Sequence, residues 1–135
     1  MQVDIQSKSS MTISQLKYFR ERIFAAEHEA DAGPRSVWDN RNYCPRFSVI
    51  LLIKQRLPIG TFYIGGPKNS VVVDWWLDSR YRKQGYATEA IDLLATNLKI
   101  GGYTGVGRMS NKAVGDELIA SQKLIDRFRN HFENR

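Results

Sequence analysis

The residues best suited to chemistry are gathered in one stretch, Trp75 to Ala90. An apolar segment is followed there by a short basic turn with one glycine, and then by the first turn of an amphipathic helix. The first N–H groups of a helix have no partner inside the helix, and the helix dipole adds partial positive charge at the same place. The stretch therefore predicts backbone donors that converge on one anion, such as a phosphate. The positive charges of the chain are densest here, at Arg80, Arg82 and Lys83.

The segments around this stretch alternate between strand and helix patterns. Thr12 and Gln15 have the spacing of a capping box, which predicts the start of a helix over residues 13–30. Val71 to Leu77 is apolar on both faces except at Asp74, which predicts a strand in the centre of a sheet. In the first half of the chain we expect a strand near Val3, the helix over 13–30, and strands over 47–54, 59–64 and 71–77. A helix from Ala87 that stops at Gly101 follows, then a weak strand over 103–109 and a last helix capped by Asp116. This order predicts a mixed α/β fold.

Length and composition limit the class of protein. A chain of 135 residues, 42% hydrophobic and 25% charged, predicts one globular domain over residues 1–135. No apolar run is long enough to span a bilayer, and Met1 to Asp4 lacks the features of a signal peptide, so we expect a cytoplasmic protein with no membrane partner. Cys44 is the only cysteine, which excludes an intrachain disulfide and a multi-cysteine zinc site, and no metal site is expected.

The net charge of +6 favours an acidic partner, which could be a phosphorylated cofactor, an acidic peptide or nucleic acid. The positive charges are scattered outside the basic turn, so a merely soluble basic surface is the alternative interpretation. The aromatic residues do not have the spacing of a known RNA-reading motif, which makes nucleic acid the weaker choice.

The basic turn resembles the signature of the GNAT superfamily of acetyl-CoA-dependent N-acetyltransferases. That signature is Arg or Gln, two residues, Gly, one residue, then Gly or Ala, and here it is Arg82 to Ala87. The flanks Trp76-Leu77-Asp78 and Ala87-Thr88-Glu89-Ala90 are similar to the branch that acetylates ribosomal-protein N-termini, and Ile59-Gly60 stands where that branch usually has Ile-Gly. The resemblance covers residues 47–111. It implies a mixed central sheet in which antiparallel strands are followed by a parallel splayed pair, flanked by helices.

The resemblance also implies a donor and the residues that bind it. Acetyl-CoA would give its acetyl group directly to an amine, of a peptide or a protein. Its pantetheine arm would pair with Trp75–Asp78, where a backbone N–H near Leu77 would face the thioester carbonyl and stabilise the oxyanion. Trp76 would either line this cleft or pack in the core. The backbone of the turn would hold the pyrophosphate through Arg82, Lys83, Gln84, Gly85, Tyr86, Ala87 and Thr88.

The catalytic residues follow the family pattern less closely. The attacking amine must lose a proton, and the branch often has a Glu on the strand before the signature. Here Asp74 is the only ionisable residue of that strand, so it is the candidate base, with a salt-bridge partner or a solvent-exposed carboxylate as the alternative. Tyr103 is the candidate acid for the thiolate. Asn111 is the candidate pantetheine contact, or else a turn residue before the last helix.

The end of the chain also departs from the pattern. The family usually adds two strands after the last helix, whereas this chain stops at Arg135. We therefore expect the 103–109 strand to be a sheet edge that a homodimer or a macromolecular substrate covers. The missing Glu and the missing strands leave an alternative function open, in which the same fold is a catalytically inactive module that binds CoA, a protein or nucleic acid.

Overall fold

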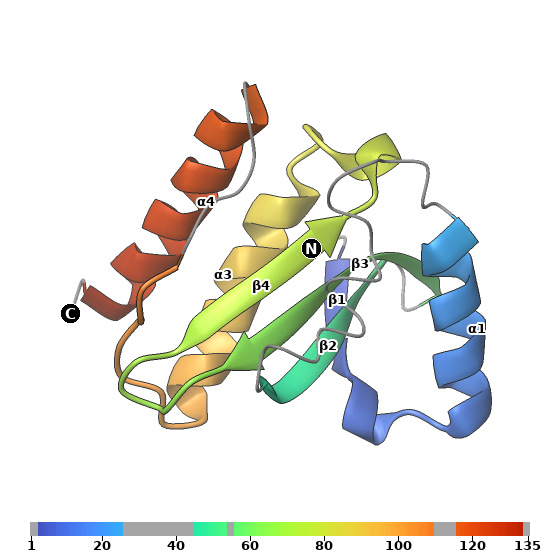
Figure 1. The fold of residues 1–135 in the computed structure, drawn as a ribbon, viewed down its shortest axis with the longest axis horizontal. Helices are drawn as coiled ribbons and strands as arrows, with labels where there is room; N and C mark the ends of the chain where they lie inside the picture. Colours follow the sequence, from blue (N-terminus) through green and yellow to red (C-terminus); the bar gives the residue numbers. More distant parts are fainter. Residues whose placement is uncertain (1–2, 26–44, 54–55, 110–115, 134–135) are drawn as a thin grey trace.

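Four antiparallel strands form the sheet that carries the rest of the fold (Figure 1). They are β1 (Val3–Ser7), β2 (Pro45–Ile53), β3 (Leu57–Gly65) and β4 (Val72–Leu77), and they lie side by side in the order β1-β2-β3-β4. The structure is a computed structural model that describes residues 3–25, 45–53, 56–109 and 116–133.

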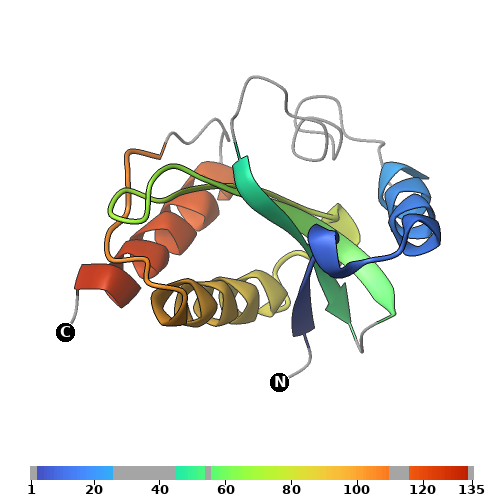
Figure 2. The ribbon, with the colours of Figure 1, turned by 90° about the horizontal axis from the view of Figure 1, so that it is seen from below.

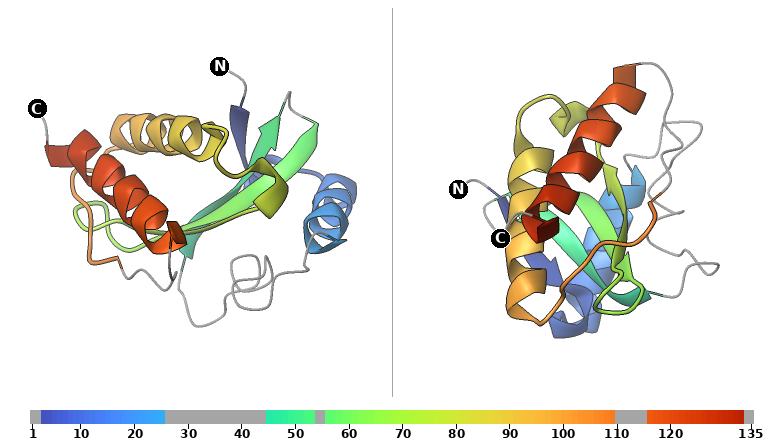
Figure 3. Two further views of the ribbon diagram at one scale, coloured as in Figure 1. Left: turned by 90° about the horizontal axis from the view of Figure 1, so that it is seen from above. Right: turned by 90° about the vertical axis from the view of Figure 1, so that its left-hand side faces the viewer.

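Helices cover both faces of this sheet. In the described part of the chain they are α1 (Ile13–Ala25), α3 (Tyr86–Ile100) and α4 (Asp116–Glu133), with two short 3-10 helices, η1 (Lys8–Ser10) and η2 (Ser79–Tyr81). Figures 2 and 3 show α3 against one face with α4 beside it, and α1 on the opposite face. The predicted mixed α/β class is confirmed. No helix of the described residues is both long and apolar enough to cross a membrane.

The main core lies between the sheet and α3, and α4 closes its side. Burying each large apolar side chain contributes on the order of 1.5–3 kcal/mol to folding. Phe128 and Phe132 of α4 reach this core with their rings 5.2 Å apart, edge to face. The fully or nearly buried members include Ile59, Phe62, Ile64, Val71, Val73, Ala90, Ile91, Leu94, Leu98 and Phe128.

The capping box predicted for the first helix is confirmed. The backbone N–H of Gln15 donates to Thr12 Oγ1 at 3.1 Å, and that of Thr12 donates to Gln15 Oε1 at 3.0 Å, so the capping box is formed. The helix it starts is described as far as Ala25; the rest of the predicted range, 26–30, lies outside the described residues. The last helix buries Ile125, Phe128 and Phe132 on its inner face.

Two predictions about the sheet are wrong. β4 was expected in the sheet centre, but it is the last strand in the order, and 103–109 forms only an isolated parallel bridge, Val71 to Val106, instead of a strand. The apolar pattern of β4 has another cause, because both of its faces are covered: Val73 packs in the core with α3, and Trp76 is buried on the other face. Cover on two faces does not require a strand on both edges.

Candidate functional site

The turn between β4 and α3 has an unusual backbone. Lys83 and Gly85 both adopt the left-handed conformation, with φ of 61° and 88°. The first hydrogen bond of α3 is donated by Glu89 to the Gly85 carbonyl at 3.1 Å. The N–H groups of Tyr86, Ala87 and Thr88 therefore have no partner within the helix, and they carry the positive end of its dipole.

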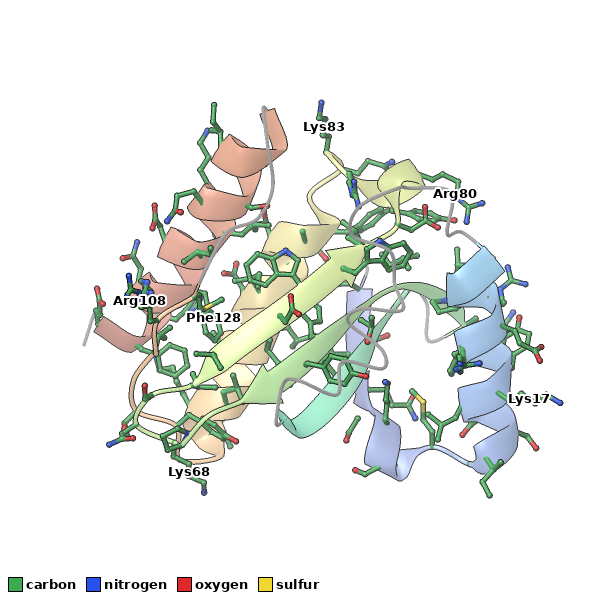
Figure 4. The ribbon with its side chains drawn as sticks, viewed as in Figure 1. Lys17, Lys68, Arg80, Lys83, Arg108 and Phe128 are labelled. Carbon is green, nitrogen blue, oxygen red and sulfur yellow. The ribbon has the colours of Figure 1, made fainter. Side chains whose placement is uncertain are left out.

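The space outside this turn is open. A Cβ atom built on Gly85 would meet no heavy atom of the described residues within 4 Å, so their backbone can be approached closely there. Lys83 stands at the tip of the turn and points away from the fold (Figure 4). A positive φ at Lys83 costs of order 1 kcal/mol for a residue with a side chain, so the fold holds this turn against a small local strain.

A buried carboxylate anchors the first part of the turn. The Asp78 side chain is 4% exposed and forms a salt bridge with Arg80 Nη2 at 2.7 Å. It also accepts the Arg80 backbone N–H at 3.0 Å, and Gln84 Nε2 donates to the Arg80 carbonyl at 2.9 Å. The hydrogen bond and the charge of Asp78 raise the pKa of Arg80. Arg80 is thus tied to Asp78, and its charge is paired with that carboxylate.

The second arginine of the turn reaches back to the strand. Arg82 Nε donates a hydrogen bond to the Leu77 carbonyl at 2.9 Å. From the sequence, Arg82 was expected only as one of the basic turn residues whose backbone would hold the pyrophosphate. Its contact with Leu77 instead connects the turn directly to the last residue of β4.

The outer edge of β4 is formed by alternate residues. The Asp78 N–H donates to Ile59 of β3 at 2.8 Å, and the ladder between β3 and β4 has no irregularity. Because consecutive backbone groups point to opposite edges of a strand, Leu77, Trp75 and Val73 direct their N–H and C=O groups away from β3. Among the described residues, no hydrogen bond reaches these groups of Val73 and Trp75.

The open edge begins where the 103–109 segment leaves β4. The Val71 N–H donates to Gly105 at 2.9 Å and the Gly107 N–H donates to Val71 at 2.7 Å, which makes the parallel bridge. Arg129 of α4 then donates from Nη2 to the Gly107 carbonyl at 3.1 Å. Figure 1 shows the two segments separating from this point toward the turn. The edge from Val73 to Leu77 spans about 13 Å at about 3.3 Å per residue.

The structure places the other predicted cofactor residues in two groups. The turn residues 82–88 and Leu77 are brought together at one end of β4, as described above. Trp76 differs, because its N–H and C=O face β3 opposite Thr61. The residue is 4% exposed, and its Nε1–H has no hydrogen-bond partner among the residues that the structure describes. The range Trp75–Asp78 predicted for pairing with the ligand arm includes Trp75 but not Val73, although strand alternation from Leu77 places both residues on the outer edge.

The predicted catalytic residues are not brought together. Asp74 is half-buried in the middle of β4, opposite Tyr63 and on the same face as Trp76. Tyr103 is buried in the core just beyond the C-terminal end of α3, with its ring 5.9 Å from Lys68 Nζ. A helix of 15 residues separates it from the turn by about 22 Å. Asn111 lies outside the described residues.

The arrangement as a whole suits an extended ligand with an anionic end. The turn offers converging N–H groups to an anion, and the adjoining edge offers alternating donors and acceptors to amide groups. The described residues hold no cluster of three or more His, Cys, Asp or Glu side chains that could bind a metal ion. In comparisons with known proteins, no family model and no curated protein matches this chain.

Proposed function

We propose that this chain is an acetyl-CoA-dependent N-acetyltransferase with a GNAT-like fold. The observation that carries the proposal is the continuity of two features: the open edge from Val73 to Leu77 ends at the turn whose backbone donors surround Gly85. Coenzyme A has the matching order of groups, because its pyrophosphate is followed by an arm with two amides and then by the sulfur. The single parallel bridge at Val71 supports the splayed pair that the resemblance implies.

Each part of the donor has a place in this arrangement. The N–H groups of Tyr86, Ala87 and Thr88 would bind the pyrophosphate, and the open space outside Gly85 would admit it. The pantetheine amides would pair with the outward groups of Val73 and Trp75 like an added strand. The Leu77 carbonyl already accepts a hydrogen bond from Arg82 Nε, and the Leu77 N–H would be the group that meets the thioester.

The reaction would be a direct transfer. The amine lone pair attacks the thioester carbon, a C–N bond forms, and the carbonyl electrons move to oxygen, where the Leu77 N–H stabilises the charge. The oxyanion then collapses, the C–S bond breaks, and the sulfur leaves as thiolate. Asp74 is the proposed base that takes the proton from the amine, because it is the ionisable residue of β4. The acceptor would be an amine of a peptide or a protein.

The first test is calorimetry with acetyl-CoA. We expect a Kd for acetyl-CoA of tens of micromolar or lower. The absence of binding heat at these concentrations would refute the proposal. The second test measures release of free thiol from acetyl-CoA with a panel of peptides and small amines. Wild-type turnover that Asp74→Asn lowers by about 10²-fold or more would support the assigned base. Equal rates for the two proteins would remove that role from Asp74.

One observation favours a second candidate, a module that binds CoA without catalysis. Tyr103, the candidate acid, is packed in the core at the far end of α3 from the turn. The two candidates differ in one measurement. Tight acetyl-CoA binding with no thiol release for any amine would favour the binding module over the enzyme.

A further inference from the structure

The hydrogen bond between Arg82 and Leu77 decides what the end of the open edge offers to a ligand. Both the N–H and the C=O of Leu77 leave β4 on its outer side, as the bond from Asp78 to Ile59 requires. Arg82 Nε donates a hydrogen bond to the Leu77 carbonyl oxygen at 2.9 Å. At Val73 and Trp75 the edge presents both a donor and an acceptor, whereas at Leu77 it presents a donor beside a positive charge.

This difference favours one kind of ligand group at Leu77. A second carbonyl placed beside a bare Leu77 C=O would be repelled by it, and a developing oxyanion would be repelled more strongly. The guanidinium removes that acceptor and adds a cation within a few ångströms. The Leu77 position therefore matches a carbonyl oxygen that gains negative charge.

We propose that Arg82 is a positioning residue for the acetyl thioester: by holding the Leu77 carbonyl, it leaves the Leu77 N–H as the group that meets the thioester oxygen. This inference rests on the proposed function, and it assigns Arg82 a task separate from phosphate attraction. Attraction of a phosphate group requires only that Arg82 carries its positive charge somewhere on the turn. The positioning task needs an N–H donor at one atom, Nε.

Two substitutions distinguish the hydrogen-bond donor of Arg82 from its positive charge. In Arg82→Gln the amide nitrogen stands the same number of bonds from Cα as Arg Nε, so the donor to Leu77 is kept while the charge is lost. Gln is also the other residue that the signature admits at this position. Arg82→Met has a methyl group at that position and is neutral as well. The two variants therefore differ in the donor and share the loss of charge. Lys83→Met is a control that removes a charge from the same turn at an exposed side chain.

The measurement is the ratio of the calorimetric Kd of CoA to that of acetyl-CoA, because CoA lacks the thioester carbonyl. We expect wild type, Arg82→Gln and Lys83→Met to bind acetyl-CoA about fivefold more tightly than CoA, the value of one net hydrogen bond. For Arg82→Met the ratio should fall to within about twofold of one. The affinity for CoA itself should fall equally in the two Arg82 variants.

The outcomes decide between the two proposals. If Arg82→Met keeps the ratio of Arg82→Gln, the positioning role is refuted while the proposed function stands. If wild type binds neither ligand, the proposed function fails and this inference fails with it. Thermal unfolding of each variant checks that it is folded. If Arg82→Met has a melting temperature near that of wild type and a Kd ratio near one, the positioning role is supported over a general loss of structure.

Discussion

Arg129 of α4 donates a hydrogen bond from Nη2 to the carbonyl oxygen of Gly107 at 3.1 Å. The Gly107 N–H already bonds Val71, so its carbonyl is the group that the next rung of a parallel ladder would offer to Val73. Arg129 binds that carbonyl, and the pairing with β4 stops after one bridge. With Arg82 on Leu77 at the other end, an arginine bounds each end of the open edge.

The affinity for acetyl-CoA should depend on the size and the charge of the side chain introduced at Gly85. Gly85→Glu and Gly85→Gln both place a side chain in the open space outside the turn and strain a φ of 88° by the same amount. We expect Gln to weaken acetyl-CoA binding by about tenfold, and Glu to weaken it by a further tenfold or more because its charge repels the pyrophosphate. Calorimetry measures both affinities.

Protein stability gives the control for these variants. The strain should lower the free energy of unfolding by about 1 kcal/mol in both, since the space itself is free. Both proteins should therefore remain folded by circular dichroism. Wild-type affinity in the Glu variant would contradict the assignment of this turn to an anion.

Gly60 should be intolerant of any side chain for a different reason. A Cβ atom at this position would lie 2.5 Å from the Trp76 carbonyl oxygen on β4. We expect Gly60→Ala to lower the free energy of unfolding by about 2 kcal/mol or more in urea titrations, because the two strands would have to separate. Gly101→Ala is the matched control: the nearest atom there is 3.4 Å away, and we expect a change of at most about 1 kcal/mol. Equal costs for both variants would show that close strand contact is not the cause.

The sequence predicted the turn at Gly85 and the helices α1 and α3 well because their signals are local. The glycine at position 85, the capping box at Thr12 and the glycines after Ile100 act on residues within a few positions. The sequence also drew attention to Arg82, but not to its hydrogen-bond partner. A hydrogen bond from Arg82 to Leu77 depends on how the turn folds back on the strand, and residue types alone do not show this.

The open edge was predicted less well because it depends on distant parts of the chain. The pattern of Val71 to Leu77 indicates two covered faces, and it was interpreted as two paired edges. Pairing on the outer edge is limited by Arg129, which comes from the last helix. Tyr103 shows the same limit, since only the packing of the core fixes its place far from the turn.

The contact between α3 and α4 should weaken at low pH. The hydrogen bond from Arg127 to Asp92, helped by His131 and opposed by partial burial, lowers the pKa of Asp92 from 3.8 to about 2. Because the pKa is lower in the folded state, the stability it provides is present above pH 4 and is lost between about pH 4 and pH 2. The Asp92 side chain is 34% exposed, so screening by solvent reduces this contribution to about 1 kcal/mol.

Asp92→Asn tests this contribution. Its free energy of unfolding in urea should be about 1 kcal/mol below wild type at pH 7, and the difference should shrink as the pH falls toward 2. Asp126→Asn is the control, because Asp126 is an exposed carboxylate of α4 with Gln122 as its hydrogen-bond partner. The idea fails if the deficit of Asp92→Asn is the same at pH 7 and at pH 2.

Arg129 should keep the outer edge of β4 available to a ligand. In Arg129→Met the Gly107 carbonyl is released, and we expect it to pair with the Val73 N–H and extend the parallel ladder. Hydrogen exchange at Val73 should slow by about tenfold, and acetyl-CoA should bind several-fold more weakly because the edge is then occupied. Arg127→Met removes the same charge from α4 while leaving Gly107 bonded to Arg129, so it should change neither quantity. If Arg129→Met leaves the exchange rate and the affinity at wild-type values, the edge is kept open by something other than this arginine.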